Sequence, residues 1–183
     1  MTNDPDMELV DLAIGGDERS FESLIERHYM SIYQLSFRWC RVKEDAEEIT
    51  QEVFIKLGRK LNTFNRRSSF KTWLYRITIN TAKDYSRKNA TSRFYEAAFA
   101  EEHSREKSDL TASNPIGVKE LYEAIDTLPA RQKAALMLVA AEGMNHKEAA
   151  AVLKCSETTV SWRIHQARKT LKKIFSGWFE NGK

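Results

Sequence analysis

Cysteine is scarce in this sequence, and long apolar runs are absent. The two cysteines, Cys40 and Cys155, form neither a CxxC pair nor a cluster with histidine, which argues against a disulfide framework and a structural zinc site. No apolar run approaches the roughly 20 residues that a membrane-spanning helix needs. The acidic start, MTNDPDMELV, does not have the character of a signal peptide. We therefore predict a cytoplasmic protein that is not inserted in a membrane and holds no metal.

The sequence also lacks the motifs of enzyme chemistry. It has no glycine-rich phosphate loop and no nucleophile motif, and its four histidines are scattered. We predict that the protein is not an enzyme and that it has no cofactor and no small-molecule substrate. Its net charge is only +3, so nucleic-acid binding has to be argued from local charge. With 42% hydrophobic and 30% charged residues, the chain can bury a core.

The most informative stretch is NHKEAAAVLKCSETTVSWRIHQARKTLKK, which begins at Asn145. Asn145 lies three residues before Glu148, the spacing of a capping box, and this predicts the start of one helix. Ser156 can cap a second helix after a short break. The second helix carries an apolar stripe at Val160, Ile164, Ala167 and Leu171. This pattern indicates a helix-turn-helix, although a helical hairpin with a solvated basic face would also produce it.

The opposite face of the second helix is polar. A recognition helix needs this division, because its apolar side holds it on a support helix while its outward side chains reach base edges in the major groove. Two arginines at the edges of the polar face, Arg163 and Arg168, can reach phosphates. The outward set consists of Thr158, Ser161, Trp162, His165, Gln166 and Lys169.

The run from Leu128 to Leu171 is similar to region four of the extracytoplasmic-function (ECF) sigma factors, which binds the minus-35 promoter element. Trp162 stands where the family more often has a small or polar residue. Gln166 stands where a basic residue is frequent, and it can pair with adenine through two hydrogen bonds. Because of these two departures, the resemblance does not tell which promoter bases the helix recognises. The resemblance implies minus-35 contacts from Ser156, Thr158, Thr159, Ser161, Trp162, Arg163, His165, Gln166 and Arg168.

Two helices are predicted at the start of the chain. The first covers Met7 to Ile14 and stops at Gly15-Gly16, and Asp17 then caps a long amphipathic helix. No second ligand falls one turn from His28, so we interpret this residue as a packed core histidine. The apolar positions of the long helix are Phe21, Leu24, Ile25, Tyr29, Ile32, Leu35 and Trp39.

A third helix is predicted over DAEEITQEVFIKLGRKL, from Asp45 to Leu61, with an apolar stripe and acidic first turns. Acidic residues suit the positive end of the helix dipole, which is a sufficient structural explanation for them. The segment also resembles the ECF sigma helix that binds the clamp of the largest RNA polymerase subunit. The resemblance implies polymerase contacts from Asp45, Glu48, Gln51, Glu52 and Phe54.

Basic and aromatic residues are concentrated between Asn65 and Arg93, where eight basic residues and one acidic residue give a net charge of +7. The combination suits a single nucleic-acid strand, because cations follow phosphates while rings hold unstacked bases. A helix capped by Ser68 or Ser69 is predicted here. Taken singly, its Phe70 and Trp73 are better explained as core residues than as base contacts.

The sequence FKTWLYRITINTAKDY in this segment is similar to the ECF sigma segment that recognises and melts the minus-ten element. By that resemblance, the loop from Phe64 to Ser68 forms one wall of a pocket for a flipped base. Asn80 and Lys83 would face the DNA strand. The implied minus-ten contacts are Phe64, Asn65, Arg66, Arg67, Lys71, Trp73, Arg76, Asn80 and Lys83.

A polar segment from Phe94 to Asn114, with five acidic and two basic residues, predicts a linker. Asn114-Pro115 supplies a helix start, and a further helix is expected from Ala134 to Ala141. We therefore predict an all-α fold with two small helical domains joined by a flexible linker, the C-terminal one a four-helix helix-turn-helix domain. The expected boundaries are 1–92 for sigma region 2, 93–113 for the linker and 114–183 for sigma region 4.

The resemblance covers nearly the whole chain, in the family's order. It implies an alternative sigma factor that binds core RNA polymerase, directs it to specific promoters and promotes strand opening. The implied partners are core polymerase, promoter DNA and an anti-sigma factor. A stand-alone helix-turn-helix repressor or activator is the alternative, but it would leave the acidic helix and the basic, aromatic segment without a role.

Overall fold

The computed structural model describes residues 4–99 and 117–181. The chain divides into two compact units, residues 1–108 and 109–183. Every regular element in the described residues is a helix, so the predicted all-α fold class is confirmed.

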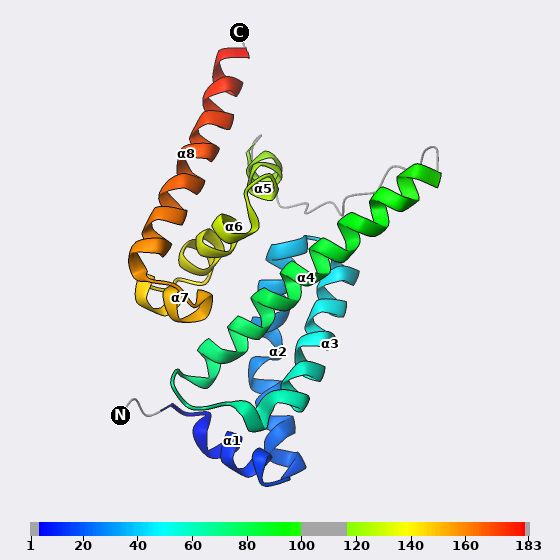
Figure 1. The fold of residues 1–183 in the computed structure, drawn as a ribbon, viewed down its shortest axis with the longest axis vertical. Helices are drawn as coiled ribbons and strands as arrows, with labels where there is room; N and C mark the ends of the chain where they lie inside the picture. Colours follow the sequence, from blue (N-terminus) through cyan, green and yellow to red (C-terminus); the bar gives the residue numbers. More distant parts are fainter. Residues whose placement is uncertain (1–3, 100–116, 182–183) are drawn as a thin grey trace. The chain divides into compact units, whose positions relative to one another are not determined.

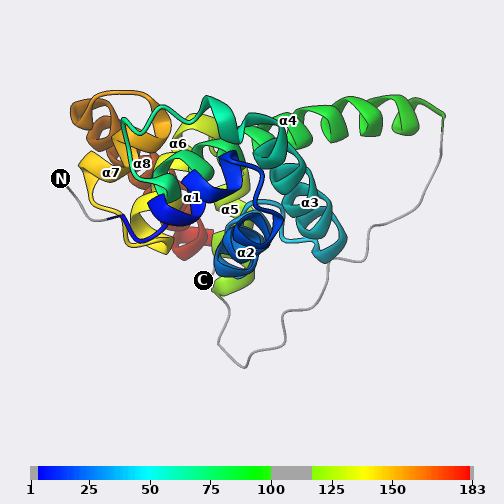
Figure 2. The same ribbon diagram turned by 90° about the horizontal axis from the view of Figure 1, so that it is seen from below.

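Four α-helices make up the described part of the N-terminal unit (Figure 1). Helix α1 (Met7–Ile14) packs on α2 (Glu18–Cys40). Helices α2, α3 (Lys43–Lys60) and α4 (Phe70–Phe99) pack against one another, and Figure 2 shows this group from a second direction. A 3₁₀ helix, Leu61–Thr63, follows α3 and leads into the loop before α4.

The core of this unit lies between α2, α3 and α4, and Trp39 links α2 to α4 by donating its Nε1–H to Ser86 Oγ at 2.8 Å. The predicted apolar stripe of α3 is buried. On α2, however, Tyr29 is 44% exposed, because its ring stacks on Phe54 at the surface. The buried apolar side chains include Leu24, Ile32 and Leu35 of α2, Ala46, Ile49, Val53 and Leu57 of α3, and Phe70, Leu74, Tyr75 and Ile79 of α4.

The described part of the C-terminal unit also contains four α-helices, as predicted. Helix α8 packs against the other three. A π-helix, Met137–Ala141, continues α6. The α-helices are α5 (Val118–Asp126), α6 (Ala130–Leu136), α7 (His146–Leu153) and α8 (Glu157–Asn181).

Several helix limits differ from the sequence prediction, and α3 runs from Lys43 to Lys60 rather than from Asp45 to Leu61. Helix α6 begins at Ala130 rather than Ala134, because the extended backbone of Pro129 (ψ 135°) allows a helix to start directly after it. The π-helix that continues α6 ends shortly before Gly143, whose φ of 67° lies in the left-handed region that glycine adopts without strain. The Asn114-Pro115 start falls outside the described residues. Helix α4 continues to Phe99, into residues that the sequence assigned to the linker.

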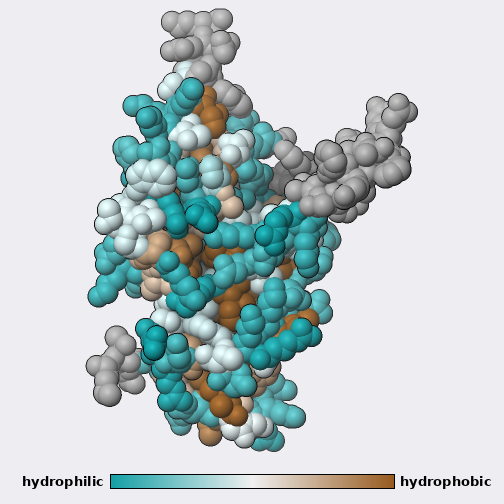
Figure 3. Space-filling model, in the orientation of Figure 1, coloured by the Kyte–Doolittle hydropathy of each residue, from teal (hydrophilic) through white to brown (hydrophobic). Residues whose placement is uncertain are grey.

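The visible surface in Figure 3 is mainly hydrophilic, with apolar residues in small patches. The exposed large apolar side chains include Met30 on α2 (59% exposed) and Trp162 on α8 (58% exposed). None of the described helices is long and apolar enough to span a membrane.

Candidate nucleic-acid and protein interfaces

The sequence sets the ends of α7 and α8 through local hydrogen bonds. Asn145 and Glu148 form the predicted capping box: Asn145 Oδ1 accepts the Glu148 N–H at 2.9 Å, and Glu148 Oε2 accepts the Asn145 N–H at 2.8 Å. Lys154 ends α7 in the left-handed conformation. Ser156 Oγ then accepts the Thr159 N–H at 3.1 Å, which confirms the predicted cap of α8. The two helices and their turn therefore form as expected.

Helix α8 presents one buried face and one polar face. Val160 and Ala167 are fully buried and Ile164 is nearly so. Trp162 is 58% exposed, so a large ring is offered to solvent instead of being packed in the core. Thr159, Arg163 and Gln166 are half-buried at the edges. The exposed residues of the predicted minus-35 set are Ser156, Thr158, Ser161, Trp162, His165 and Arg168.

Two contacts in this region were not foreseen from the sequence. Ser161 Oγ and His146 Nδ1 are 2.8 Å apart, which joins α8 to the first residue of α7. Arg163 Nη1 donates to Cys155 Sγ at 3.5 Å, so the guanidinium leans toward the turn between the helices. No spacing in the sequence indicates either contact, because both depend on the angle at which the helices cross.

The residues predicted to contact polymerase lie on α3. Glu48 and Gln51 are exposed, while Asp45, Glu52 and Phe54 are half-buried. Lys56 Nζ is 3.3 Å from Glu52 Oε1 and also donates to Thr81 Oγ1 of α4 at 3.2 Å. The Phe54 ring stacks on Tyr29 at a centroid distance of 5.9 Å. The surface is therefore acidic with one aromatic edge, and we call these five α3 residues the acidic face.

Tyr85 of α4 contacts the acidic face. Its hydroxyl lies 2.8 Å from Asp45 Oδ1 and 3.0 Å from Glu48 Oε2. Burial is the largest cause that raises the pKa of Tyr85 well above its ordinary value; the two carboxylates add to it, and a hydrogen bond with Asn89 opposes it. Tyr85 belongs to the basic, aromatic segment between Asn65 and Arg93, and the structure directs its hydroxyl to α3.

This arrangement predicts a difference in alkaline stability for Tyr85→Phe. Because the folded-state pKa is raised, the contribution of the neutral phenol to stability is fully present below the unfolded pKa of about 10. It falls progressively as the pH rises past that value toward the folded pKa. The Phe variant has no such contribution to lose. We expect its melting temperature to fall less than that of the parent between about pH 9 and about pH 11. Tyr33→Phe, in the same unit, is the control, and equal slopes for all three proteins would contradict the prediction.

The predicted minus-ten residues lie on the loop 64–69, here called the minus-ten loop, and on α4. Ser69, rather than Ser68, caps α4, since its Oγ accepts the Thr72 N–H at 3.2 Å. Phe64 is only 6% exposed and its ring packs on Phe70 and Trp73, with centroid distances of 5.9 and 5.2 Å. The Phe64 ring therefore packs against α4 and holds the loop on that helix, and it is not offered to solvent.

Asn65, Arg66, Arg67 and Ser69 of the minus-ten loop are exposed, and Ser68 is half-buried. Arg66 has a left-handed backbone (φ 59°) and forms an ion pair with Asp11 of α1. Asn65 Oδ1 accepts the Arg67 N–H at 3.2 Å, which shapes the turn. The side chains of Asn65, Arg66 and Arg67 are the part of the loop that a nucleic-acid strand could reach.

On α4, Arg76, Asn80 and Lys83 follow one another at helical spacing and so share a face. Asn80 is exposed, and the other two are half-buried. Burial lowers the pKa of the Arg76 guanidinium. Lys71 is exposed, with its Nζ 5.4 Å from the centre of the Tyr75 ring. The described residues contain no cluster of His, Cys, Asp and Glu able to hold a metal ion.

Comparison with known proteins gives two family matches. Residues 24–91 match the model described as Sigma-70 region 2, and residues 119–171 match Sigma-70, region 4. The RNA polymerase sigma-H factor of Pseudomonas aeruginosa PAO1 is 33% identical, covering 94% of this chain and 95% of that protein. The ECF RNA polymerase sigma-E factor of Escherichia coli K12 is 32% identical, covering 91% and 92%. The structure of CnrH in complex with the cytosolic domain of CnrY is similar with a TM-score of 0.68 and 25% identity, covering 94% and 97%.

Proposed function

The chain belongs to the sigma-70 family of RNA polymerase sigma factors, in its ECF group, and we propose from this that it is an alternative sigma factor that directs core RNA polymerase to specific promoters and promotes strand opening. The observation that carries the proposal is the match to both sigma regions in order, along a chain that aligns with its relatives over nearly its full length. In this role the protein is an initiation factor of the cytoplasm and performs no catalysis of its own.

The proposed division of labour follows the two units. Residues 1–92 dock on polymerase through the acidic face and recognise the minus-ten element, and residues 114–183 recognise the minus-35 element. The linker expected over 93–113 lies between them, and its first residues belong to the end of α4. The acidic face suits a basic surface on the polymerase clamp. We propose as a further partner an anti-sigma factor that masks the free protein; the similar protein CnrH is likewise held in a complex with another protein, the cytosolic domain of CnrY.

The chemistry of strand opening requires binding energy for extruded bases, because no ATP is consumed. Unstacking costs a few kcal/mol per base, which the protein must offset by holding the base outside the duplex. We assign that role to the exposed side chains of the minus-ten loop, with Arg76, Asn80 and Lys83 of α4 along the strand. The buried Phe64 and Phe70 rings keep the loop in place beneath them.

Reading of the minus-35 element is assigned to the polar face of α8. Gln166 is half-buried at the edge of that face, where a helix in the major groove would bring its amide to a base edge. We expect Gln166→Ala to relax the preference at one or two upstream base pairs by about 1–3 kcal/mol. Selection from a randomised minus-35 library measures this. Lys172→Ala, which changes an exposed basic residue of α8 outside the outward set, is the control and is expected to leave base preference unchanged. An unaltered base preference in Gln166→Ala would contradict our placement of α8 in the groove.

The proposed function is tested by run-off transcription with core RNA polymerase, with and without the protein, on fragments of the source genome. We expect new, discrete start sites that depend on the protein, whose alignment yields both promoter elements. Absence of such transcripts, together with tight duplex binding by the protein alone, would instead indicate a conventional repressor or activator.

A further inference from the structure

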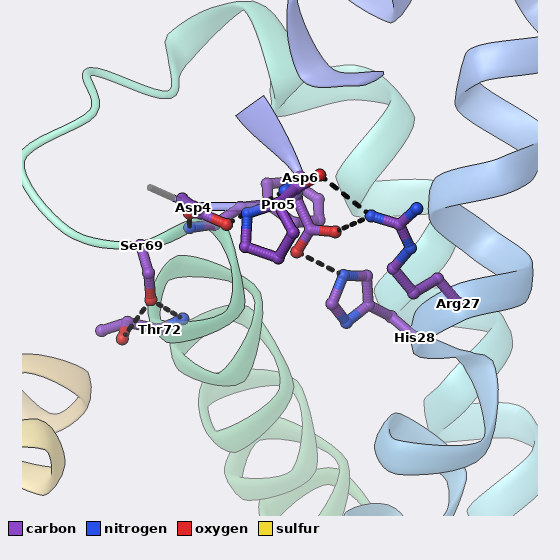
Figure 4. A network of polar contacts seen from close by, with 8 residues as sticks. Asp4, Pro5, Asp6, Arg27, His28, Ser69 and Thr72 are labelled. Carbon is purple, nitrogen blue, oxygen red and sulfur yellow. Dashed lines mark hydrogen bonds and ion pairs between the residues drawn. The ribbon is translucent and has the colours of Figure 1, made fainter. Parts of the chain in front are cut away.

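The segment that precedes α1 is anchored by a buried carboxylate. Asp6 is only 3% exposed, and both of its oxygens are engaged on α2: Oδ1 with Arg27 Nη1 at 2.6 Å and Oδ2 with His28 Nε2 at 2.8 Å (Figure 4). Arg27 also donates to the Pro5 carbonyl at 3.1 Å. A buried carboxylate is stable only when it is paired and hydrogen-bonded in this way. The segment is therefore held firmly on α2.

From this anchor Asp4 reaches the start of α4, where the minus-ten loop ends. Its Oδ2 accepts the Phe70 N–H at 2.7 Å, and its Oδ1 accepts the Asp6 N–H at 3.1 Å. The Phe70 N–H is one of the donors that a helix start leaves without a partner inside the helix, and a negative charge there is favoured by the helix dipole. One carboxylate thus links the anchored segment to α4, while Ser69 satisfies the Thr72 N–H beside it.

The minus-ten loop is held at further points by the same part of the fold. His28 packs on the Phe70 ring at a centroid distance of 5.3 Å, and Phe70 in turn contacts Phe64 at the other end of the loop. Asp11 pairs with Arg66 in the middle of the loop. That pair is about half exposed on both sides, so its contribution is small. The buried contacts of Asp6 and the part-buried hydrogen bond of Asp4 to the Phe70 N–H are therefore the stronger constraints.

We propose that Asp4 is a positioning residue for minus-ten recognition, which fixes the end of the minus-ten loop by joining the Asp6 anchor to the first residue of α4. The inference rests on the proposed function, since it assigns a supporting role to a residue outside the DNA-contacting set. Asp4 touches no base. It limits the conformations of the loop, so that Asn65, Arg66 and Arg67 meet an extruded base in one arrangement. Loss of that constraint lowers the selectivity of the loop, because several arrangements then accept different bases.

The test compares Asp4→Ala, Asp4→Asn and Glu8→Ala in the full chain. Glu8→Ala removes the same charge from an exposed position on α1. Each protein transcribes a library randomised in the minus-ten element of a promoter found by run-off transcription, and its affinity for core polymerase is measured separately. We expect Asp4→Ala to lower base discrimination at one or two positions about five-fold, comparable to the loss of a helix cap. Asn keeps one acceptor oxygen and should restore part of the discrimination, whereas Glu8→Ala should match the parent.

Polymerase affinity should stay within about two-fold for all three variants, because the acidic face is unchanged. A merely structural role for Asp4 would lower transcription equally for every library member and leave base discrimination intact, which would overturn the positioning role. If the parent protein supports no polymerase-dependent transcription, the proposed function itself fails and the positioning role with it. The two failures are thus distinguished by the activity of the parent.

Discussion

Reversal of charge at Glu48 and Glu52 together should weaken binding to core RNA polymerase by about a hundredfold, equivalent to about 3 kcal/mol. Glu48 is exposed and Glu52 is half-buried one turn further along α3, so both can face a partner at once. The double Glu→Lys change replaces attraction to a basic surface with repulsion. It also places two lysines near Lys56, which costs the exposed helix only a few tenths of a kcal/mol. The affinity is measured by titration of labelled protein with core polymerase.

A matched control is present on α2. Glu22 and Glu26 are exposed and have the same i, i+4 spacing, so their double change to lysine alters net charge equally. We expect this control to bind polymerase within about three-fold of the parent, since distant charges are screened at physiological salt. An equal loss in both double variants would indicate a general charge effect, and no loss at Glu48 and Glu52 would remove the docking role from the acidic face. Circular dichroism melting confirms that both variants fold.

The Glu48→Lys change in this experiment also removes one of the two carboxylates that can accept a hydrogen bond from the Tyr85 hydroxyl. This hydroxyl has a single proton, so it can donate a hydrogen bond to only one of Asp45 and Glu48 at a time. The contact also ties the acidic face on α3 to α4, which carries Arg76, Asn80 and Lys83. The two proposed activities of the N-terminal unit therefore lie on helices that are held together at the surface as well as through the core.

The features predicted correctly from the sequence are those set by neighbours along the chain. Asp17, Asn145 and Ser156 cap their helices as expected, because a cap needs only a side chain and a backbone N–H three residues away. The buried stripe of α3, and that of α8 except for the half-buried Leu171, follow from helical spacing in the same way. Family resemblance added the order of the two units, which periodicity alone does not give.

The features that were missed depend on contacts between distant residues. Asp4 meets the Phe70 N–H across 66 residues, and Tyr85 meets Asp45 across 40. Neither separation leaves a pattern in the sequence. The family resemblance placed the loop from Phe64 to Ser68 in the wall of a base pocket, and the structure adds that the Phe64 ring is buried on Phe70. A loop's composition does not tell which of its side chains turns inward, since that depends on the surface beneath it.

Phe70→Ala should destabilise the N-terminal unit by about 3–5 kcal/mol, the largest effect on folding that we predict. The Phe70 side chain is completely buried. The centroid of its ring lies 5.3 Å from that of His28, 5.9 Å from that of Phe64 and 6.0 Å from that of Trp73. Its removal leaves a cavity at the start of α4, where the minus-ten loop ends. Since whole domains are stable by only about 5–15 kcal/mol, the loss is a large fraction of the total.

Hydrogen exchange of the backbone amides measures the effect within one sample, because the amides of α4 and α8 give the local stability of the two units separately. Protection in α4 should fall steeply in Phe70→Ala, while protection in α8 should remain that of the parent. Phe70→Leu keeps most of the buried volume and should cost about 1 kcal/mol. Equal losses in α4 and α8 would mean that the two units do not unfold independently. Unchanged protection in α4 would show that the aromatic cluster does not support the minus-ten loop, and the proposed positioning by Asp4 would then lose its structural basis as well.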